Sequence, residues 1–94
     1  MKTKVKNVYK GESLYRLIYR LEKVQNGFKL MIREEEYDAV KFRMKKGTPP
    51  RFSEESTAVL DSISEEEACI FFNELSENLV FPCSLTYILE DCFN

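Results

Sequence analysis

The chain is 94 residues long, which leaves room for one domain (residues 1–94), and its 44% hydrophobic and 13% aromatic content supports a folded core rather than a disordered chain. It contains no histidine, which excludes histidine-based catalytic triads and zinc sites, and its longest apolar run, residues 68–72, is far shorter than the roughly 20 residues of a membrane span. All 14 Lys and Arg lie between Lys2 and Arg51, so residues 1–52, with six acids, carry a net charge of +8, and residues 53–94, with ten acids and no base, carry −10.

Two segments with alternating apolar residues predict a β-hairpin early in the chain. The alternating residues share one face of the predicted strands: Tyr15, Leu17, Tyr19 and Leu21 in residues 14–22, then Phe28, Leu30 and Ile32 in residues 28–32. Asn26-Gly27 lies between the segments and favours a type I′ turn, because both central residues of that turn need positive φ. With this turn the numbers of paired residues sum to 53, which sets Arg20 opposite Arg33.

The middle of the chain is ambiguous between strand and helix. Residues 34–46 begin with three glutamates and end with basic residues before Gly47, as a helix would. However, Val40, Phe42 and Met44 alternate with basic residues, and this period of two favours a strand. The other expected segments before residue 61 are an edge strand at residues 4–9, a terminating segment at 47–50, a loop at 53–56 and a short fourth strand at 57–60.

Two helices are predicted in the C-terminal third. Ser64 followed by Glu67 is a capping box at the start of the first helix. Apolar residues at helical spacing then form one stripe: Ala68, Phe71, Phe72, Leu75 and Leu79. This helix is expected to end near Asn78, with residues 79–81 extended before Pro82. Ser84 is expected to cap a second, short helix, whose apolar face consists of Leu85, Ile88, Leu89 and Cys92.

These segments predict an α+β fold: an antiparallel sheet of three or four strands, with an N-terminal hairpin at Asn26-Gly27 and two C-terminal helices packed on one face. The helix residues expected to meet Tyr19, Leu21, Leu30 and Ile32 of the sheet are Phe71, Phe72, Leu75, Leu85, Ile88 and Leu89. The spacings of Cys69, Cys83 and Cys92 match no metal or redox motif, so we expect reduced thiols, and Cys69 and Cys92 are expected on or beside apolar helix faces, packed in the core. No long apolar segment follows the basic N-terminus, so we expect no secretory signal and a cytoplasmic location.

The C-terminal pattern resembles a small uncharacterised bacterial family. The residues that carry the resemblance are Asp61-Ser62-Ile63-Ser64, then Leu75, Asn78, Val80, Pro82 and Leu85, and finally Ile88-Leu89-Glu90-Asp91. They resemble proteins of about this length in anaerobic Gram-positive bacteria that form a domain of unknown function, and the similarity covers mainly residues 61–91. The family has a glycine after an aromatic residue in its second strand, whereas Lys29 follows Phe28 here. The resemblance implies an α+β bacterial cytosolic protein and implies no mechanism.

Exposed acidic residues are the first candidate binding site. Glu65, Glu66, Glu74 and Glu77 are expected on the polar side of a helix that carries no Lys or Arg. An oppositely charged partner would gain on-rate from their field, although simple solubility explains them equally well. The glutamate runs at residues 34–36 and 65–67 are interpreted as solvated faces rather than as catalytic or metal-binding carboxylates.

An anion site formed by Arg20, Lys29 and Arg33 is the second candidate. In the predicted register the two arginines could bind a phosphate or a carboxylate with their guanidinium groups. Glu22 and Glu35 lie diagonal to them, however, so a ladder of alternating charges is the favoured interpretation. The tyrosines and arginines of residues 15–20 alternate between the two faces of their strand, so they cannot form one stacking platform for nucleic acid.

Two classes of function fit the sequence. The favoured class is a small non-catalytic cytosolic protein-interaction or regulatory module whose partner is another protein, and the alternative is a nucleic-acid-binding protein that uses the basic residues 1–51. Attraction between the two halves within the fold is the simpler explanation of their opposite charges. We expect no catalytic residue, no cofactor and no transition metal, because histidine and close cysteine pairs are missing, and we expect no membrane partner, because the longest apolar run is short. An enzyme built on tyrosine, lysine and glutamate is the least favoured interpretation.

Overall fold

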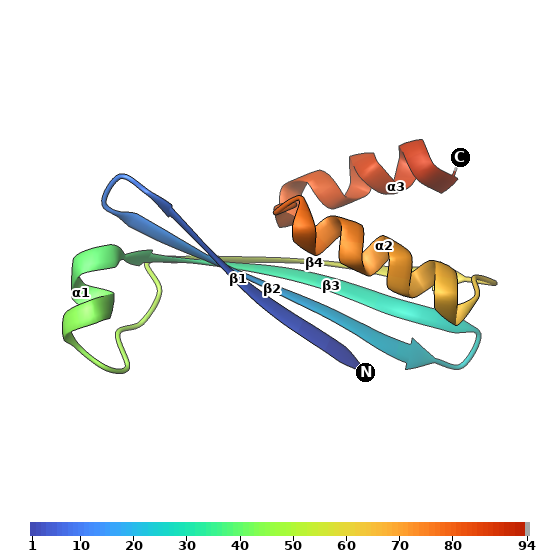
Figure 1. The fold of residues 1–94 in the computed structure, drawn as a ribbon, viewed down its shortest axis with the longest axis horizontal. Helices are drawn as coiled ribbons and strands as arrows, with labels where there is room; N and C mark the ends of the chain where they lie inside the picture. Colours follow the sequence, from blue (N-terminus) through green and yellow to red (C-terminus); the bar gives the residue numbers. More distant parts are fainter. Residues whose placement is uncertain (94) are drawn as a thin grey trace.

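A single antiparallel sheet with strand order β1-β2-β3-β4 and three α-helices make up an α+β fold over the residues that the structure describes (Figure 1). The computed structural model describes the backbone of residues 1–93 and the side chains of residues 1–90. In chain order the elements are β1 (Lys2–Lys10), β2 (Ser13–Val24), β3 (Gly27–Asp38), α1 (Ala39–Met44), β4 (Phe52–Asp61), α2 (Glu65–Glu77), the 3-10 helix η1 (Pro82–Ser84) and α3 (Leu85–Phe93). The predicted fold class and the antiparallel sheet are therefore confirmed.

Alternation along the strands sends one set of side chains to each face of the sheet. The apolar set forms the α2 face, which is buried together with α2: Leu17, Tyr19, Leu21, Phe28, Leu30 and Ile32. The opposite face carries a more polar set, which includes Arg16, Ile18, Arg20, Met31 and Arg33. Figure 1 shows α2 and α3 on the same side of the sheet and α1 at one end of it. The helix α1 lies in the segment for which a strand was the favoured prediction and a helix the alternative.

The β2–β3 hairpin turns one residue earlier than predicted. Gln25 and Asn26 form the turn, and Val24 pairs with Gly27. Paired residue numbers therefore sum to 51 rather than 53, so the register predicted for a turn at Asn26-Gly27 is wrong by two residues. Because side chains alternate with a period of two, a shift of two keeps each side chain on its predicted face.

Gly27 has a role other than the positive φ that the turn prediction assigned to it. Neither Asn26 nor Gly27 is among the described residues with positive φ. Gly27 is the first residue of β3, and a Cβ atom there would overlap the backbone carbonyl oxygen of Leu60 in β4. The glycine therefore allows β4 to approach β3 closely, which the hairpin pattern alone does not reveal.

The segment predicted as a strand over residues 34–46 is divided between a strand and a helix. Residues up to Asp38 continue β3, and α1 follows. The Asp38 carboxylate accepts hydrogen bonds from the backbone N–H groups of Val40 (3.0 Å) and Lys41 (3.1 Å), which makes Asp38 an N-cap. The alternating apolar side chains of this segment do not form a strand face, because Val40 is 58% and Met44 is 83% exposed.

The edge strands are longer than predicted. β1 confirms the edge strand expected at residues 4–9, and β4 includes the predicted strand at 57–60. The loop predicted at residues 53–56 is wrong, because these residues continue β4 and pair with β3. Glu54 and Glu55 there lie opposite Glu34 and Arg33, so the polar composition that indicated a loop belongs to an exposed edge strand.

The start of α2 confirms the predicted cap. The Ser64 hydroxyl oxygen accepts a hydrogen bond from the Glu67 backbone N–H (3.1 Å), and the hydroxyl donates to the Glu67 carboxylate (3.1 Å). The three glutamates in the first turn stabilise the helix, because their negative charges lie at the positive end of the helix dipole. The helix ends at Glu77, beside the predicted end at Asn78.

The chain then reverses and covers the rest of the α2 face. Leu79 has a φ of 52° and is 38% exposed, so it belongs neither to an extended segment nor to the predicted apolar stripe. The Val80 carbonyl oxygen accepts a hydrogen bond from the buried Tyr19 hydroxyl (2.9 Å), which satisfies that hydroxyl. Pro82 and Leu85 are buried, and α3 begins at Leu85. The predicted position of Cys92 lies outside the described side chains.

One buried cluster joins the helices to the α2 face. From the helices it includes Ala68, Phe71, Phe72, Leu75 and Leu85, with Cys69, Ile88 and Leu89 partly buried against it. These side chains meet the sheet residues predicted for them, so the predicted core is confirmed. A smaller cluster on the opposite face ties α1 to the sheet through Leu14, Tyr37, Ala39 and Phe42.

Candidate functional site

The outer side of α2 carries the acidic residues predicted as a partner-binding surface. All four are exposed, as expected, because the other side of the helix is buried: Glu65, Glu66, Glu74 and Glu77. At 3.6 residues per turn Glu66, Glu74 and Glu77 lie along one stripe, which we call the α2 acidic stripe. Glu65 points to another side, where it lines a hollow with Lys2 and Cys69. The structure therefore brings three of the four together, and their role in binding stays a prediction.

An apolar side chain lies in the centre of the α2 acidic stripe. Ile70 is 52% exposed and stands four residues from both Glu66 and Glu74. An apolar centre inside a polar or charged rim is the general arrangement of protein interfaces. Ile70 was not singled out from the sequence because it lies in the apolar run 68–72, although helical spacing places it away from the buried stripe.

The two oppositely charged halves share few close ion pairs. Among the side chains of residues 1–90, the ion pairs are Arg33–Glu35, Arg33–Glu55 and Arg51–Glu36, and of these Arg33–Glu55 (3.9 Å) joins the two halves. Lys4 approaches α2, but its ammonium group donates to the Asn73 side-chain oxygen (2.8 Å). The predicted attraction between the halves is therefore not realised as a network of close pairs, and the α2 acidic stripe has no ion-pair partner among the described residues.

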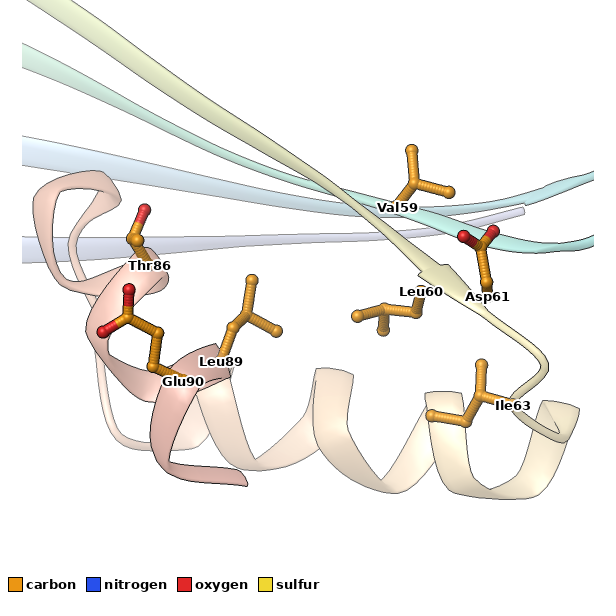
Figure 2. A pocket seen from close by; sticks show the side chains of 7 residues that line it. All are labelled: Val59, Leu60, Asp61, Ile63, Thr86, Leu89 and Glu90. Atoms are coloured by element: carbon orange, nitrogen blue, oxygen red, sulfur yellow. The ribbon is translucent and has the colours of Figure 1, made fainter. Parts of the chain in front are cut away.

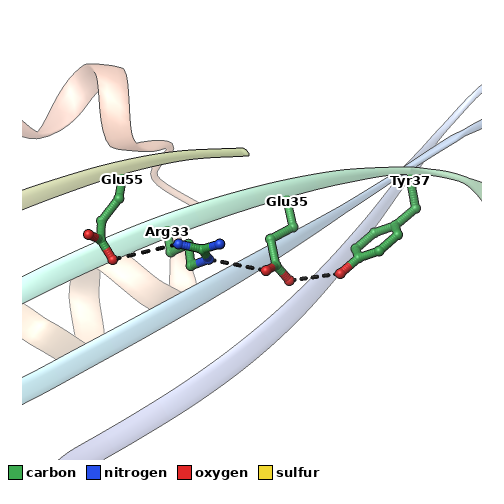
Figure 3. A network of polar contacts seen from close by, with 4 residues as sticks. All are labelled: Arg33, Glu35, Tyr37 and Glu55. Atoms are coloured by element: carbon green, nitrogen blue, oxygen red, sulfur yellow. Dashed lines mark hydrogen bonds and ion pairs between the residues drawn. The ribbon is translucent and has the colours of Figure 1, made fainter. Parts of the chain in front are cut away.

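A chain of polar contacts crosses β3 and β4 on the opposite face (Figure 3). The Tyr37 hydroxyl donates to the Glu35 carboxylate (2.9 Å), which accepts a hydrogen bond from Arg33 Nε (3.1 Å). On its other side, Arg33 lies 3.9 Å from a carboxylate oxygen of Glu55. Burial and the bond to Glu35 raise the pKa of the Tyr37 hydroxyl, so Tyr37 stays a donor at neutral pH. Arg33 thus lies between two carboxylates in a ladder of alternating charges.

The residues of the predicted anion site do not form two opposed arginines. Because the register sums to 51, Arg20 lies opposite Met31, so the predicted pairing of Arg20 with Arg33 is wrong. Arg20 and Lys29 do share a hollow of about 240 Å³ on the opposite face, lined by Arg20, Glu22, Lys29, Met31, Glu55 and Thr57. Two acids balance two bases in this hollow, so it offers an anion little net attraction.

Three carboxylates gather on the α2 face where β3 meets β4. Glu34 pairs directly with Glu54, and Glu36 lies two residues farther along β3 on the same face. Glu34 is 8% exposed, and burial, followed by the charges of Glu54 and Glu36, raises the pKa of its carboxyl group. Arg51 lies 4.0 Å from Glu36, so Glu36 has a cation nearby, whereas Glu34 and Glu54 have no ion pair among the described side chains.

Replacing Glu34 with glutamine is expected to stabilise the fold at neutral pH by about 0.5–1 kcal/mol, because it removes a like-charge pair across neighbouring strands. The pKa of Glu34 is raised in the folded state above its value of 4.5 in the unfolded chain. The charge of Glu34 therefore destabilises the fold above its folded-state pKa, and this penalty develops as pH rises from the unfolded-state pKa to the folded-state pKa. Urea unfolding of both proteins should therefore show a larger difference at about pH 7.5 than at about pH 4.5.

The matched control is Glu55→Gln, one position along from Glu54 but on the opposite face. Glu55 contacts Arg33, so its neutralisation should leave stability unchanged or lower it by under about 1 kcal/mol. A Glu34→Gln protein that is less stable than wild type at neutral pH would show that the carboxylate has a favourable partner.

A hollow of about 320 Å³ lies between β4 and α3 (Figure 2). Figure 2 shows Leu60, Ile63 and Leu89 along its apolar side, with Asp61 and Glu90 at its rim. Its lining contains two carboxylates and no basic side chain. This hollow could not be placed from the sequence, because it depends on how α3 lies against β4.

The end of the molecule formed by α1 is basic. The cations there are all exposed and have no ion pair among the described side chains: Lys41, Arg43, Lys45 and Lys46. The Arg43 guanidinium lies over the ring of Tyr9 (5.5 Å), which is 54% exposed. A groove of about 660 Å³ runs beside α1, lined by Asp38, Lys41, Met44, Lys45, Gly47, Thr48, Pro49, Pro50 and Arg51.

The tyrosines and arginines of β2 lie on the faces of the sheet predicted for them. Tyr15 and Tyr19 lie on the α2 face and Arg16 and Arg20 on the opposite face, so they form no common stacking platform.

The structure, as far as its side chains are described, contains no group of three or more Cys, Asp or Glu able to hold a metal ion. Over the same residues, no helix is long and apolar enough to cross a membrane.

Comparison of the chain with family models, with curated proteins and with solved structures finds no match. The resemblance of residues 61–91 to an uncharacterised bacterial family therefore stays a prediction. The candidate surfaces rest on the geometry of this chain alone.

Proposed function

We propose that this chain is a small non-catalytic module that binds another protein through the α2 acidic stripe. The observation that carries the proposal is the exposed Ile70, surrounded by Glu66, Glu74 and Glu77, none of which has an ion-pair partner among the described residues. Such a surface suits a partner with an apolar pocket in a basic rim, because the apolar contact supplies affinity and the charges supply on-rate and orientation.

The rest of the fold supports a rigid presentation of this surface. The inner side of α2 is buried, with Phe72 fully inaccessible, and the Ser64 cap secures the first turn. A helix held in this way loses little conformational freedom on binding. The absence of histidine from the sequence further favours binding over acid–base catalysis.

Charge reversal on α2 tests the proposal. Immobilised wild type, the Glu74→Lys/Glu77→Lys variant and a Glu12→Lys/Asp61→Lys control are exposed to native cell extract, and the captured proteins are quantified by mass spectrometry. The control makes the same change in net charge at exposed sites away from the stripe. We expect a protein captured by wild type and control to be reduced at least about tenfold on the α2 variant, because opposed like charges cost several kcal/mol. Equal capture by all three baits would show that the stripe is not the binding surface.

Nucleic-acid binding is the second candidate function, and the basic end at α1 favours it. Four exposed cations without ion pairs among the described side chains lie there beside the exposed ring of Tyr9, a combination that suits a phosphate backbone and a stacked base. An electrophoretic mobility shift with single-stranded DNA that weakens steeply with salt, and that is lost in a Lys45→Glu/Lys46→Glu variant, would support it. No shift at low salt would leave protein binding as the remaining candidate.

A further inference from the structure

The two edges of the sheet carry opposite charges. β1 contains Lys2, Lys4, Lys6 and Lys10 and no acid, and these lysines all lie on the α2 face. β4, at the other edge, contains Glu54, Glu55 and Asp61 and no base. Each edge presents backbone N–H and C=O groups that no other strand among the described residues pairs with.

The charge of Glu54 in β4 lacks an ion pair among the described side chains of its own molecule. Glu54 lies opposite Glu34 on the α2 face, and neither carboxylate has an ion-pair partner among the described side chains. A cation delivered to the outer side of β4 on this face would relieve their repulsion. Lysines at the edge of β1 are on the same face of the sheet and, among the described side chains, similarly lack ion pairs.

We infer that β4 of one molecule pairs with β1 of a second copy, so that the sheet continues from one molecule into the next. In the sheet β1 and β4 run in opposite directions, so a second copy placed with its α2 face on the same side presents β1 antiparallel to β4. If the numbers of paired residues sum to an even value, the lysines of β1 and Glu54 of β4 lie on the same face of the continued sheet.

One such register brings compatible side chains together. If Lys6 lies opposite Glu54 of the other copy, Val8 lies opposite Phe52 and Thr3 lies opposite Thr57. Opposite charges, an aromatic with a β-branched residue, and two threonines are all favourable cross-strand pairs. Phe52 is 49% exposed in the single molecule, so this contact would cover apolar surface that is otherwise in water.

The same charges disfavour the other edge pairings. Two β1 strands would oppose lysines, and two β4 strands would oppose glutamates, whereas β1 with β4 opposes unlike charges. When β4 of one molecule pairs with β1 of another, the resulting dimer still has one unpaired β1 and one unpaired β4. Further copies can therefore add at both ends. The expected assembly therefore grows with concentration beyond a dimer, and each step is weak because one strand pair buries little surface.

Sedimentation velocity of the wild-type chain over a range of concentrations tests this pairing. At low salt the average mass should rise with concentration past twice 11.1 kDa, and high salt should lower it. Lys6→Glu alone and Glu54→Lys alone should each weaken association at least about tenfold, whereas the combined Lys6→Glu/Glu54→Lys chain, with wild-type net charge, should restore it. Glu54→Lys is expected to fold, because it replaces one member of the Glu34–Glu54 like-charge pair.

Two controls separate this interface from the α2 acidic stripe. Lys23→Glu and Glu74→Lys make the same charge changes at exposed residues outside β1 and β4, and both should associate as wild type does. A monomer at all concentrations, or association that neither edge variant weakens, would overturn the edge pairing. Loss of association in Glu74→Lys would overturn it too, because the contact would then lie on α2. None of these outcomes depends on capture of another protein by the α2 acidic stripe, so the two proposals fail separately.

Discussion

Replacing Phe72 with alanine is expected to lower the free energy of unfolding by about 3–5 kcal/mol, the range for a large aromatic side chain in a core. Phe72 is fully buried, and its ring lies in the cluster that joins α2 to the sheet. The Lys4 ammonium lies 5.7 Å from the ring centroid, so the substitution also removes a cation–π contact. A domain of this size has only about 5–15 kcal/mol of stability, so this loss is a large fraction of the total.

Urea unfolding followed by circular dichroism measures this loss. Ile70→Ala is the matched control on the same helix, and because Ile70 is 52% exposed it should cost under about 1 kcal/mol. A cost for Phe72→Ala below about 1 kcal/mol would remove Phe72 from the core and contradict the packing of α2 on the sheet.

Replacing Gly27 with alanine is expected to cost about 2–3 kcal/mol, because no flexible side chain can move out of the way. The added Cβ atom would overlap the Leu60 carbonyl oxygen and would lie 3.0 Å from the Leu60 carbonyl carbon and 3.1 Å from Asp61 Cα. All three are backbone atoms of β4. The β3–β4 ladder must therefore open at this end, and amide hydrogen exchange should accelerate there.

Gly11→Ala is the control for glycine replacement in general. Gly11 has a φ of +62°, and a Cβ atom added there would meet no other atom within 4 Å. Its replacement should therefore cost only the roughly 1–2 kcal/mol of a left-handed backbone. If Gly27→Ala were no more harmful than Gly11→Ala, β4 would not approach β3 as the structure describes.

The faces of the strands could be predicted from the sequence, but their register could not. Period-two alternation of Tyr19, Leu21, Leu30 and Ile32 identifies the buried face, and that assignment survives a shift of two residues. The register was predicted from a turn at Asn26-Gly27, whereas Gly27 belongs to β3 and must be small because of Leu60 in β4, far along the chain. The glycine of a dipeptide that is typical of a turn is thus explained by a contact distant in sequence.

A strand was favoured over a helix for the segment that contains α1, because six residues are too few to display a helical period. The signal that could have found it is Asp38, whose carboxylate caps the helix. For the candidate site, the exposure of Glu66, Glu74 and Glu77 followed from the buried stripe of α2. The placement of Ile70 among them, and the pairing of Arg20 with Met31, needed the actual geometry.

The central claim is that the opposite charges of this molecule face outward to other molecules rather than neutralising each other. The most direct test is the free energy of unfolding of dilute protein at about 0.02 M and about 0.5 M sodium chloride, since salt screens attraction between exposed charges. Because Arg33–Glu55 is the one close ion pair between the halves among the described side chains, we expect a change under about 1 kcal/mol. A loss of more than about 2 kcal/mol at high salt would contradict the claim, because it would show that attraction between the halves holds the fold together.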